Sequence, residues 1–115
     1  MIESKITRRY RRLKAPKSAL VAWKTADQKE VSHVRTIALG GLFIQTKNPA
    51  KSGSILQMLI VTPRGDLRVR ANVRSVVEGE GMGVAITSME QEDRGKLDRW
   101  LKHLAETEEL AITLA

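Results

Sequence analysis

The sequence predicts a small, mainly β domain: a six-stranded antiparallel β-barrel with one C-terminal α-helix. Three observations predict this class. Six short apolar segments follow one another at hairpin spacing between residues 18 and 88, with turn residues between them. The hydrophobic period changes to that of a helix only after residue 88. A chain of 115 residues fits one domain with one core, and closing the sheet into a barrel removes exposed strand edges.

The six strands are expected near residues 18–24, 30–38, 42–46, 54–61, 66–77 and 82–88. In the first strand, Ala19, Val21 and Trp23 fall at every second position and therefore share one face. The pair Gly40-Gly41 then interrupts the pattern, as a bulge or a sharp turn does. The segments before and after this pair are therefore expected to form two separate strands.

The segment 66–77 has the clearest strand pattern in the chain. One face is apolar and carries Leu67, Val69, Ala71, Val73 and Val77. The opposite face is polar and carries Arg68, Arg70, Asn72 and Arg74. This alternation is typical of an antiparallel sheet with one face on the core and one face in water.

The last part of the chain predicts a helix from about residue 90 to residue 105, followed by a tail over 106–115. Acidic residues lie in the expected first turn, where the helix dipole favours them. An apolar stripe at helical spacing follows, made of Leu97, Trp100, Leu101 and Leu104. We expect this stripe to pack against the barrel.

The basic charge of the chain lies almost entirely at its N-terminus. Residues 1–24 contain eight basic residues and one acidic residue, which equals the net charge of +7 of the whole chain. Residues 25–115 contain equal numbers of basic and acidic residues. We therefore expect residues 1–17 to form a flexible basic arm ahead of a barrel-and-helix domain over 18–105. Such an arm attracts polyanions.

The composition excludes several classes of function. The chain has no Cys, which excludes disulfide scaffolds, thiolate metal sites and Cys nucleophiles. The two histidines, His33 and His103, belong to no catalytic or metal-binding motif, so we expect no enzyme, no catalytic residue and no metal site. No apolar run is long enough to cross a bilayer and no signal-peptide pattern opens the chain, so we expect a cytoplasmic protein without membrane insertion.

Two short stretches match signatures of a known family. Arg8 and Arg12 are two arginines separated by three residues, and a proline and a strand follow them. The stretch from Thr36 to Gly41 precedes the apolar Leu-Phe-Ile strand. In these features, over about residues 7–104, the sequence resembles a PilZ domain, the bacterial receptor module for cyclic di-GMP (c-di-GMP). The family's second signature has Asp or Asn at the position of Thr36, Ser at that of Ala38 and Gly at that of Gly41.

The resemblance implies a single-domain c-di-GMP receptor that signals in trans to an unidentified protein partner. Arg8 and Arg12 would contact its phosphates and guanines, because a guanidinium binds both bidentately. The turn at Gly41 would lie against the ligand. In the second signature Thr36 keeps a hydroxyl, whereas Ala38 offers no hydrogen bond. Other arginines that could replace the lost contacts are Arg9, Arg11, Arg35, Arg68, Arg70 and Arg74.

Two alternative functions remain open at this point. A degenerate PilZ domain that does not bind c-di-GMP could serve as a protein-interaction module, for example in motility or pilus assembly. A basic barrel could instead bind nucleic acid through its arm. Stacking on bases requires several exposed aromatic residues, and Tyr10 is the only aromatic residue among the arginines of the arm. We expect no cofactor other than the dinucleotide ligand.

Overall fold

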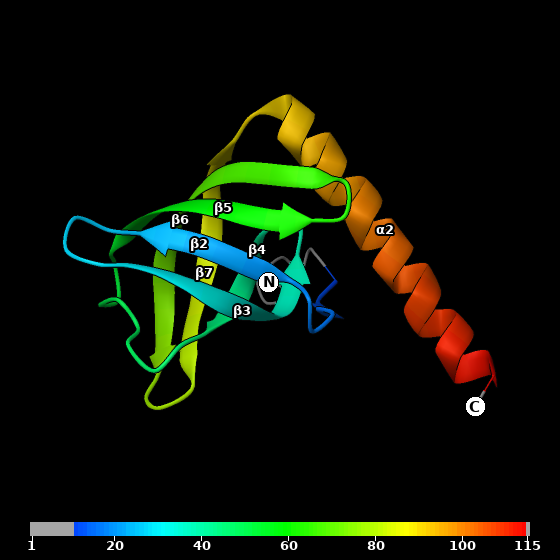
Figure 1. The fold of residues 1–115 in the computed structure, drawn as a ribbon, viewed down its shortest axis with the longest axis horizontal. Coiled ribbons are helices and arrows are strands. Elements are labelled where there is room, and N and C mark those ends of the chain that lie inside the picture. The colour runs from blue at the N-terminus through cyan, green and yellow to red at the C-terminus, as the bar shows by residue number, and fades with distance from the viewer. Residues whose placement is uncertain (1–10, 115) are drawn as a thin grey trace, which may run out of the picture.

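The computed structural model describes residues 11–114 and shows a closed antiparallel barrel with one C-terminal helix (Figure 1). Its elements are β1 (Leu13–Lys14), β2 (Leu20–Lys24), β3 (Lys29–Ala38), β4 (Gly41–Gln45), β5 (Ile55–Thr62), β6 (Gly65–Val77), β7 (Gly81–Met89) and α2 (Gln91–Leu114). The strand order is β1-β3-β2-β5-β6-β7-β4, and the pairing of β3 with β4 closes a barrel of the six longer strands. The predicted fold class is confirmed.

The short strand β1 was not predicted, and it extends the sheet beside β3. Leu13 pairs with Ile37, beyond the point where β2 begins opposite His33, and the Ala15 amide donates to the Arg35 carbonyl oxygen at 3.0 Å. Leu13 is buried at 4% exposure. Residues 13–15 of the predicted arm therefore belong to the barrel wall. The strand β1 was missed because it has only two residues, which is too short to recognise from a sequence pattern. Arg8 and Arg9 lie outside the described residues.

The inward side chains of all six longer strands form one core. Val21 and Trp23 are buried on the same face, as their spacing predicts, and Trp23 donates from Nε1 to the Ser32 hydroxyl oxygen at 3.0 Å. This hydrogen bond satisfies the indole N–H inside the barrel. The core continues without a break to Leu97 and Trp100 of α2.

The predicted face of β6 is correct up to Val73 and wrong at Val77. A bulge lies between Val73 and Ser75 in the pairing with β7, and beyond it no residue of β6 is buried. Val77 is consequently 40% exposed rather than part of the core. An alternating pattern cannot reveal a bulge, because the residues on each side of it look like one continuous strand.

The helix α2 is longer than predicted. It contains 24 residues and ends at Leu114, so the expected tail is helical over its described residues. After Gly95 no glycine or proline interrupts the chain, and the alanines, leucines and glutamates of this region are good helix formers. Leu97, Trp100 and Leu101 are buried, whereas the distal half extends away from the barrel (Figure 1).

Candidate ligand-binding site

A cleft of about 370 Å³ lies where the β3–β4 turn meets β6 and β7. We call it the arginine cleft. Its lining residues include Arg12, Thr36, Ala38, Gly41, Phe43, Arg74, Ser75 and Gly83. These residues come from five separate parts of the sequence, so the cleft exists only when the barrel is closed. The Ile86 amide donates to the Gly40 carbonyl oxygen at 2.9 Å and holds the β3–β4 turn against β7.

Two β-bulges flank the cleft, and each leaves an arginine without a partner in the strand ladder. In β3 the pairing with β4 passes from Val34 to Thr36 and omits Arg35. In β6 the pairing with β7 passes from Val73 to Ser75 and omits Arg74. Bulges redirect side chains and are frequent beside functional sites. Here Arg74 lines the cleft.

Arg35 is held beside the cleft rather than in its lining. Its guanidinium carbon lies 4.7 Å from the centroid of the Phe43 ring, which is a cation–π contact. It also forms an ion pair with Glu80 at 3.2 Å. Phe43 itself lines the cleft, so Arg35 supports one of the cleft walls.

Two glycines leave space that the cleft requires. A Cβ at Gly41 would collide with the Val84 carbonyl oxygen across the β4–β7 pair. A Cβ at Gly83 would lie 2.7 Å from the Ser75 hydroxyl oxygen, closer than real Cβ contacts allow. The close approach of backbone to backbone therefore explains Gly41, in addition to any contact with a ligand.

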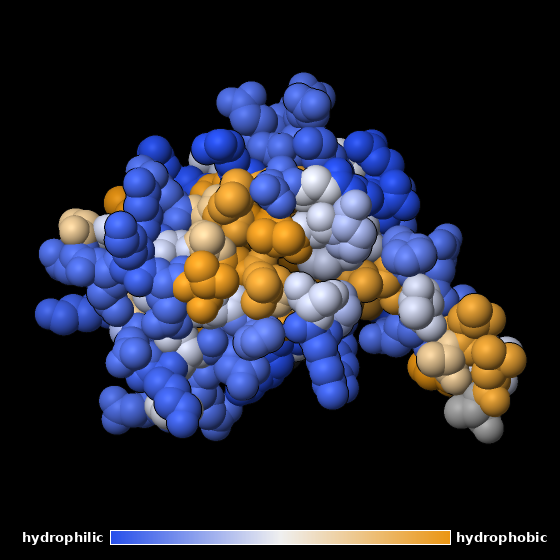
Figure 2. All heavy atoms as spheres, in the orientation of Figure 1, coloured by the Kyte–Doolittle hydropathy of each residue, from blue (hydrophilic) through white to orange (hydrophobic). Residues whose placement is uncertain are grey.

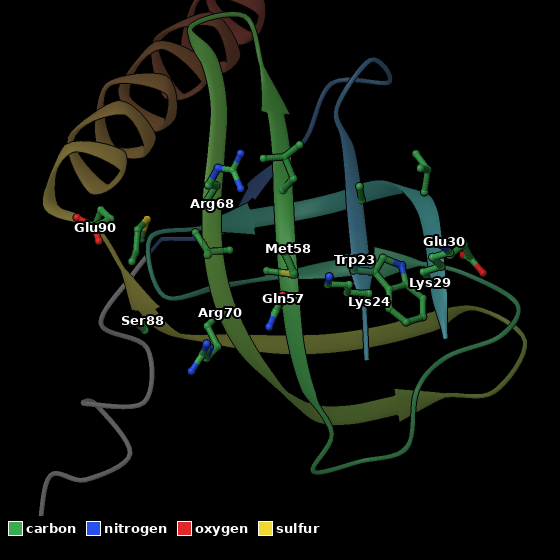
Figure 3. Close-up of a pocket in the computed structure, with 15 residues that line it drawn as sticks. Trp23, Lys24, Lys29, Glu30, Gln57, Met58, Arg68, Arg70, Ser88 and Glu90 are labelled. Atoms are coloured by element: carbon green, nitrogen blue, oxygen red, sulfur yellow. The ribbon is translucent and has the colours of Figure 1, made fainter. Parts of the chain in front are cut away.

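The structure gathers some of the predicted site residues and separates others. Arg12, Thr36, Ala38, Gly41 and Arg74 line the arginine cleft together. Arg11, next to Arg12 in the chain, forms an ion pair with Glu108 of α2 at 2.9 Å instead. Arg68 and Arg70 lie in a different hollow, on the outer surface of β6 (Figure 3).

Phe43, Ser75 and Gly83 also line the cleft, although sequence reasoning did not select them. The apolar strand that contains Phe43 had been recognised, but only as a strand and not as part of the site. Ser75 reaches the cleft because of the β6 bulge, which has no sequence signature. Its position follows only from the register of β6 against β7.

The cleft favours anions. Arg12 and Arg74 are exposed, and no Asp or Glu is among the lining residues. The ion pairs found within residues 11–114 involve neither of these two arginines. The guanidinium groups of Arg12 and Arg74 can therefore donate charge-assisted hydrogen bonds to the phosphate or carboxylate oxygens of a ligand, because no carboxylate of the described region pairs with them.

Neither a metal centre nor a membrane helix is found over residues 11–114. No group of three or more His, Cys, Asp or Glu side chains there is arranged to hold a metal ion. In the same region, α2 is not apolar enough to cross a membrane.

The family model of the PilZ domain matches residues 6–103 of the chain. This match extends over most of the sequence, and the chain belongs to the PilZ family. No curated protein sequence matches the chain significantly.

Solved structures share this fold. YcgR from Escherichia coli, in complex with c-di-GMP, has a TM-score of 0.78 at 20% identity, over 94% of this chain and 50% of YcgR. The c-di-GMP complex of MrkH from K. pneumonia has a TM-score of 0.75 at 13% identity, over 89% of this chain and 53% of MrkH. The inhibitor of motility MotI/DgrA from Bacillus subtilis has a TM-score of 0.69 at 18% identity, over 88% of this chain and 51% of that protein.

At these identities the likeness establishes the fold. The chain spans about half the length of YcgR, MrkH and MotI/DgrA. The PilZ domain of YcgR alone, also with c-di-GMP, is covered over 98% of its length with a TM-score of 0.74. The chain is therefore similar to one domain of these larger proteins.

Proposed function

We propose that this chain is a receptor for c-di-GMP that binds the dinucleotide in the arginine cleft and acts on a protein partner in trans. One observation supports this above all. In a chain of the PilZ family, the cleft brings Arg12 and Arg74 together with the Thr36–Gly41 stretch, and no carboxylate of residues 11–114 lines it. The c-di-GMP complexes of YcgR and MrkH, which share the fold, support the choice of ligand.

The residues of the cleft match the chemistry of this ligand. The two phosphates of c-di-GMP accept charge-assisted hydrogen bonds from guanidinium groups. The O6 and N7 atoms of guanine accept two parallel hydrogen bonds from the same kind of group. Arg12 and Arg74 supply such donors from opposite sides of the cleft, and the Thr36 hydroxyl adds a donor and an acceptor.

Arg8 is the second arginine that we assign to the ligand. Four residues of chain span at most about 14 Å, so Arg8 lies within reach of any ligand that Arg12 contacts. The cleft volume of about 370 Å³ lies near the lower end of the usual range of small-molecule sites, about 300–1,000 Å³. A dinucleotide would therefore extend beyond the cleft, where Arg8 and Arg9 could contact it.

A second candidate function rests on Ala38. Its methyl group lines the cleft where the PilZ signature has a serine hydroxyl, and the residue is 6% exposed. A hydrogen bond to a charged group contributes about 1.5–3 kcal/mol, so this loss weakens binding about ten- to 150-fold unless another group replaces it. Without replacement, the chain would be an interaction module that does not bind c-di-GMP.

Calorimetric titration with c-di-GMP separates the two functions. The wild type is compared with Arg12→Ala, Arg74→Ala, Arg8→Ala and the double variant Thr36→Asp/Ala38→Ser. Each arginine variant should lose about ten- to 150-fold in affinity, because each loses a charge-assisted contact of about 1.5–3 kcal/mol. The double variant should bind more tightly than the wild type.

Matched controls make this result specific. Arg68→Ala removes a guanidinium of the same kind from β6 outside the cleft and should leave the affinity unchanged. Arg12→Lys should restore binding only in part, because an ammonium keeps the charge but not the planar fork. GTP and a short DNA duplex serve as competing anions. Absence of c-di-GMP binding by both the wild type and the double variant would leave the interaction module as the function.

A further inference from the structure

The outer surface of the barrel carries an exposed apolar face on β3, β2 and β5. It consists of Leu20, Ala22, Val31, Leu59 and Val61, which we call the outer apolar face. Cross-strand pairing joins Ala22 to both Val31 and Leu59, so these side chains form one continuous surface. Val31 is 64% exposed and Val61 is 40% exposed. Figure 2 shows the face as an apolar patch in the middle of this side of the molecule.

Basic side chains border this face. Lys24, Lys29, Arg68 and Arg70 surround a hollow of about 870 Å³ that includes Ala22, Val31 and Leu59 of the outer apolar face (Figure 3). None of these four cations takes part in the ion pairs of residues 11–114. The two carboxylates of the hollow are Glu30 and Glu90, and Glu30 already accepts a hydrogen bond from Ser32. The hollow is therefore net positive.

The distal end of α2 has the opposite character. Residues 106–114, which we call the helix tail, contain three glutamates and no basic residue. Leu110, Ile112 and Leu114 of this tail are 59%, 72% and 78% exposed. The free carbonyl groups at the end of the helix add to its negative potential. The helix tail is thus acidic and apolar, and within residues 11–114 its one ion pair joins Glu108 to Arg11.

We propose that the outer apolar face binds the helix tail of a second copy of this chain. The two surfaces match in both properties that decide such a contact. Each exposes aliphatic side chains whose burial is favourable, and their charges are opposite. An amphipathic helix on an apolar groove with a charged border is a common mode of recognition. This inference is independent of c-di-GMP binding, because neither surface belongs to the arginine cleft.

The tail of the same chain cannot make this contact. The hollow includes Met89 and Glu90, directly before the first residue of α2. Leu110 follows Glu90 by 20 helical residues, which places it about 30 Å along the helix axis. Figure 2 shows the apolar patch and the apolar end of the helix well apart on the molecule. A straight helix therefore requires that the tail come from another molecule.

Analytical ultracentrifugation over a wide concentration range tests the contact. The wild type should self-associate. A tail variant, Leu110→Gln/Leu114→Gln, keeps good helix formers, and a face variant, Val31→Glu/Val61→Glu, repels the acidic tail. Each should raise the dissociation constant about tenfold or more. Val76→Glu/Val77→Glu adds the same two charges to two valines, each 40% exposed, at the far end of β6 and should associate like the wild type.

Mixing the two defective variants is the decisive step. The face variant keeps an intact tail and the tail variant keeps an intact face, so an equimolar mixture should form a one-to-one complex although each variant alone is monomeric. This result would also show that both variants are folded. A mixture that stays monomeric overturns the proposal. A face variant that associates like the wild type would indicate tail-to-tail pairing and overturns it as well, as does a wild type that remains monomeric throughout.

Discussion

At the level of single residues, the arginine cleft depends on two glycines as well as on its two arginines. Gly41 and Gly83 permit close approach of β4 to β7 and of β7 to the bulge of β6. The extra residue in β6 directs Arg74 toward the cleft, and Arg12 lines the same cleft from the segment before β1. The placement of Arg74 in the cleft thus follows from a backbone irregularity.

Gly41→Ala should destabilise the protein by about 1–3 kcal/mol, because the added methyl group collides with the Val84 carbonyl oxygen and separates β4 from β7. Gly95→Ala is the matched control. Position 95 lies inside α2, where a Cβ would meet only the flexible end of Arg99, so alanine should stabilise by about 0.5–1 kcal/mol. Urea unfolding measures both changes. Equal midpoints for Gly41→Ala and the wild type would contradict the close approach.

At the level of elements, β6 and α2 each serve two parts of the molecule. The outward residues Arg68 and Arg70 of β6 border the hollow beside the outer apolar face, while Arg74 further along the strand lines the arginine cleft. The proximal half of α2 packs on the barrel through Leu97, Trp100 and Leu101, and its distal half is exposed. Among residues 11–114, the hydrophobic packing of the helix on the barrel therefore ends at Ala105.

Trp100→Ala should destabilise the protein by about 3–5 kcal/mol, since Trp100 is 1% exposed and its loss leaves a cavity between helix and barrel. Leu110→Ala changes a leucine that is 59% exposed on the same helix and should alter the free energy of unfolding by no more than about 0.5 kcal/mol. Urea midpoints of the two variants measure the difference. A helix that is not docked would give similar midpoints for both.

At the level of the whole molecule, the arginine cleft forms only when the barrel is closed. Its residues come from the segment before β1 and from β3, β4, β6 and β7, which are far apart in the sequence. Arg11 and Arg12 are neighbours in the chain, yet Arg11 pairs with Glu108 of α2 and Arg12 borders the cleft. The segment before β1 thus connects the cleft with the helix.

A ligand of this cleft should stabilise the entire fold, because the unfolded chain does not assemble the site. At a free c-di-GMP concentration of 100 times its dissociation constant, the expected gain in free energy of unfolding is about 2.7 kcal/mol. Thermal unfolding with and without c-di-GMP measures the gain. At the same c-di-GMP concentration Arg74→Ala should show a much smaller gain, and GTP should give little with the wild type. A gain for Arg74→Ala as large as that of the wild type would place the ligand elsewhere.

The local patterns of the sequence were sufficient for the six longer strands and the first part of the helix, but not for β1 or for the helical residues after 105. Alternating apolar residues and short apolar runs between turn residues located the six longer strands, and the apolar stripe around Trp100 located the helix and its packed face. These predictions succeed because burial on one face imposes a period that each segment displays by itself. Arg12, Thr36, Ala38, Gly41 and Arg74 were also selected from the sequence, four of them by resemblance to the PilZ signatures and Arg74 as part of a basic strand face.

Only the tertiary structure decided which of these residues meet. It separated Arg35, Arg68 and Arg70 from the cleft, added Phe43 and Ser75, and placed the two-residue strand β1 beside β3. Bulges and registers produced these outcomes. A bulge depends on how two distant strands pair, and the buried positions of β6 end at its bulge, as Val77 shows. Such pairing is a property of the closed barrel, so no single segment of the sequence contains it.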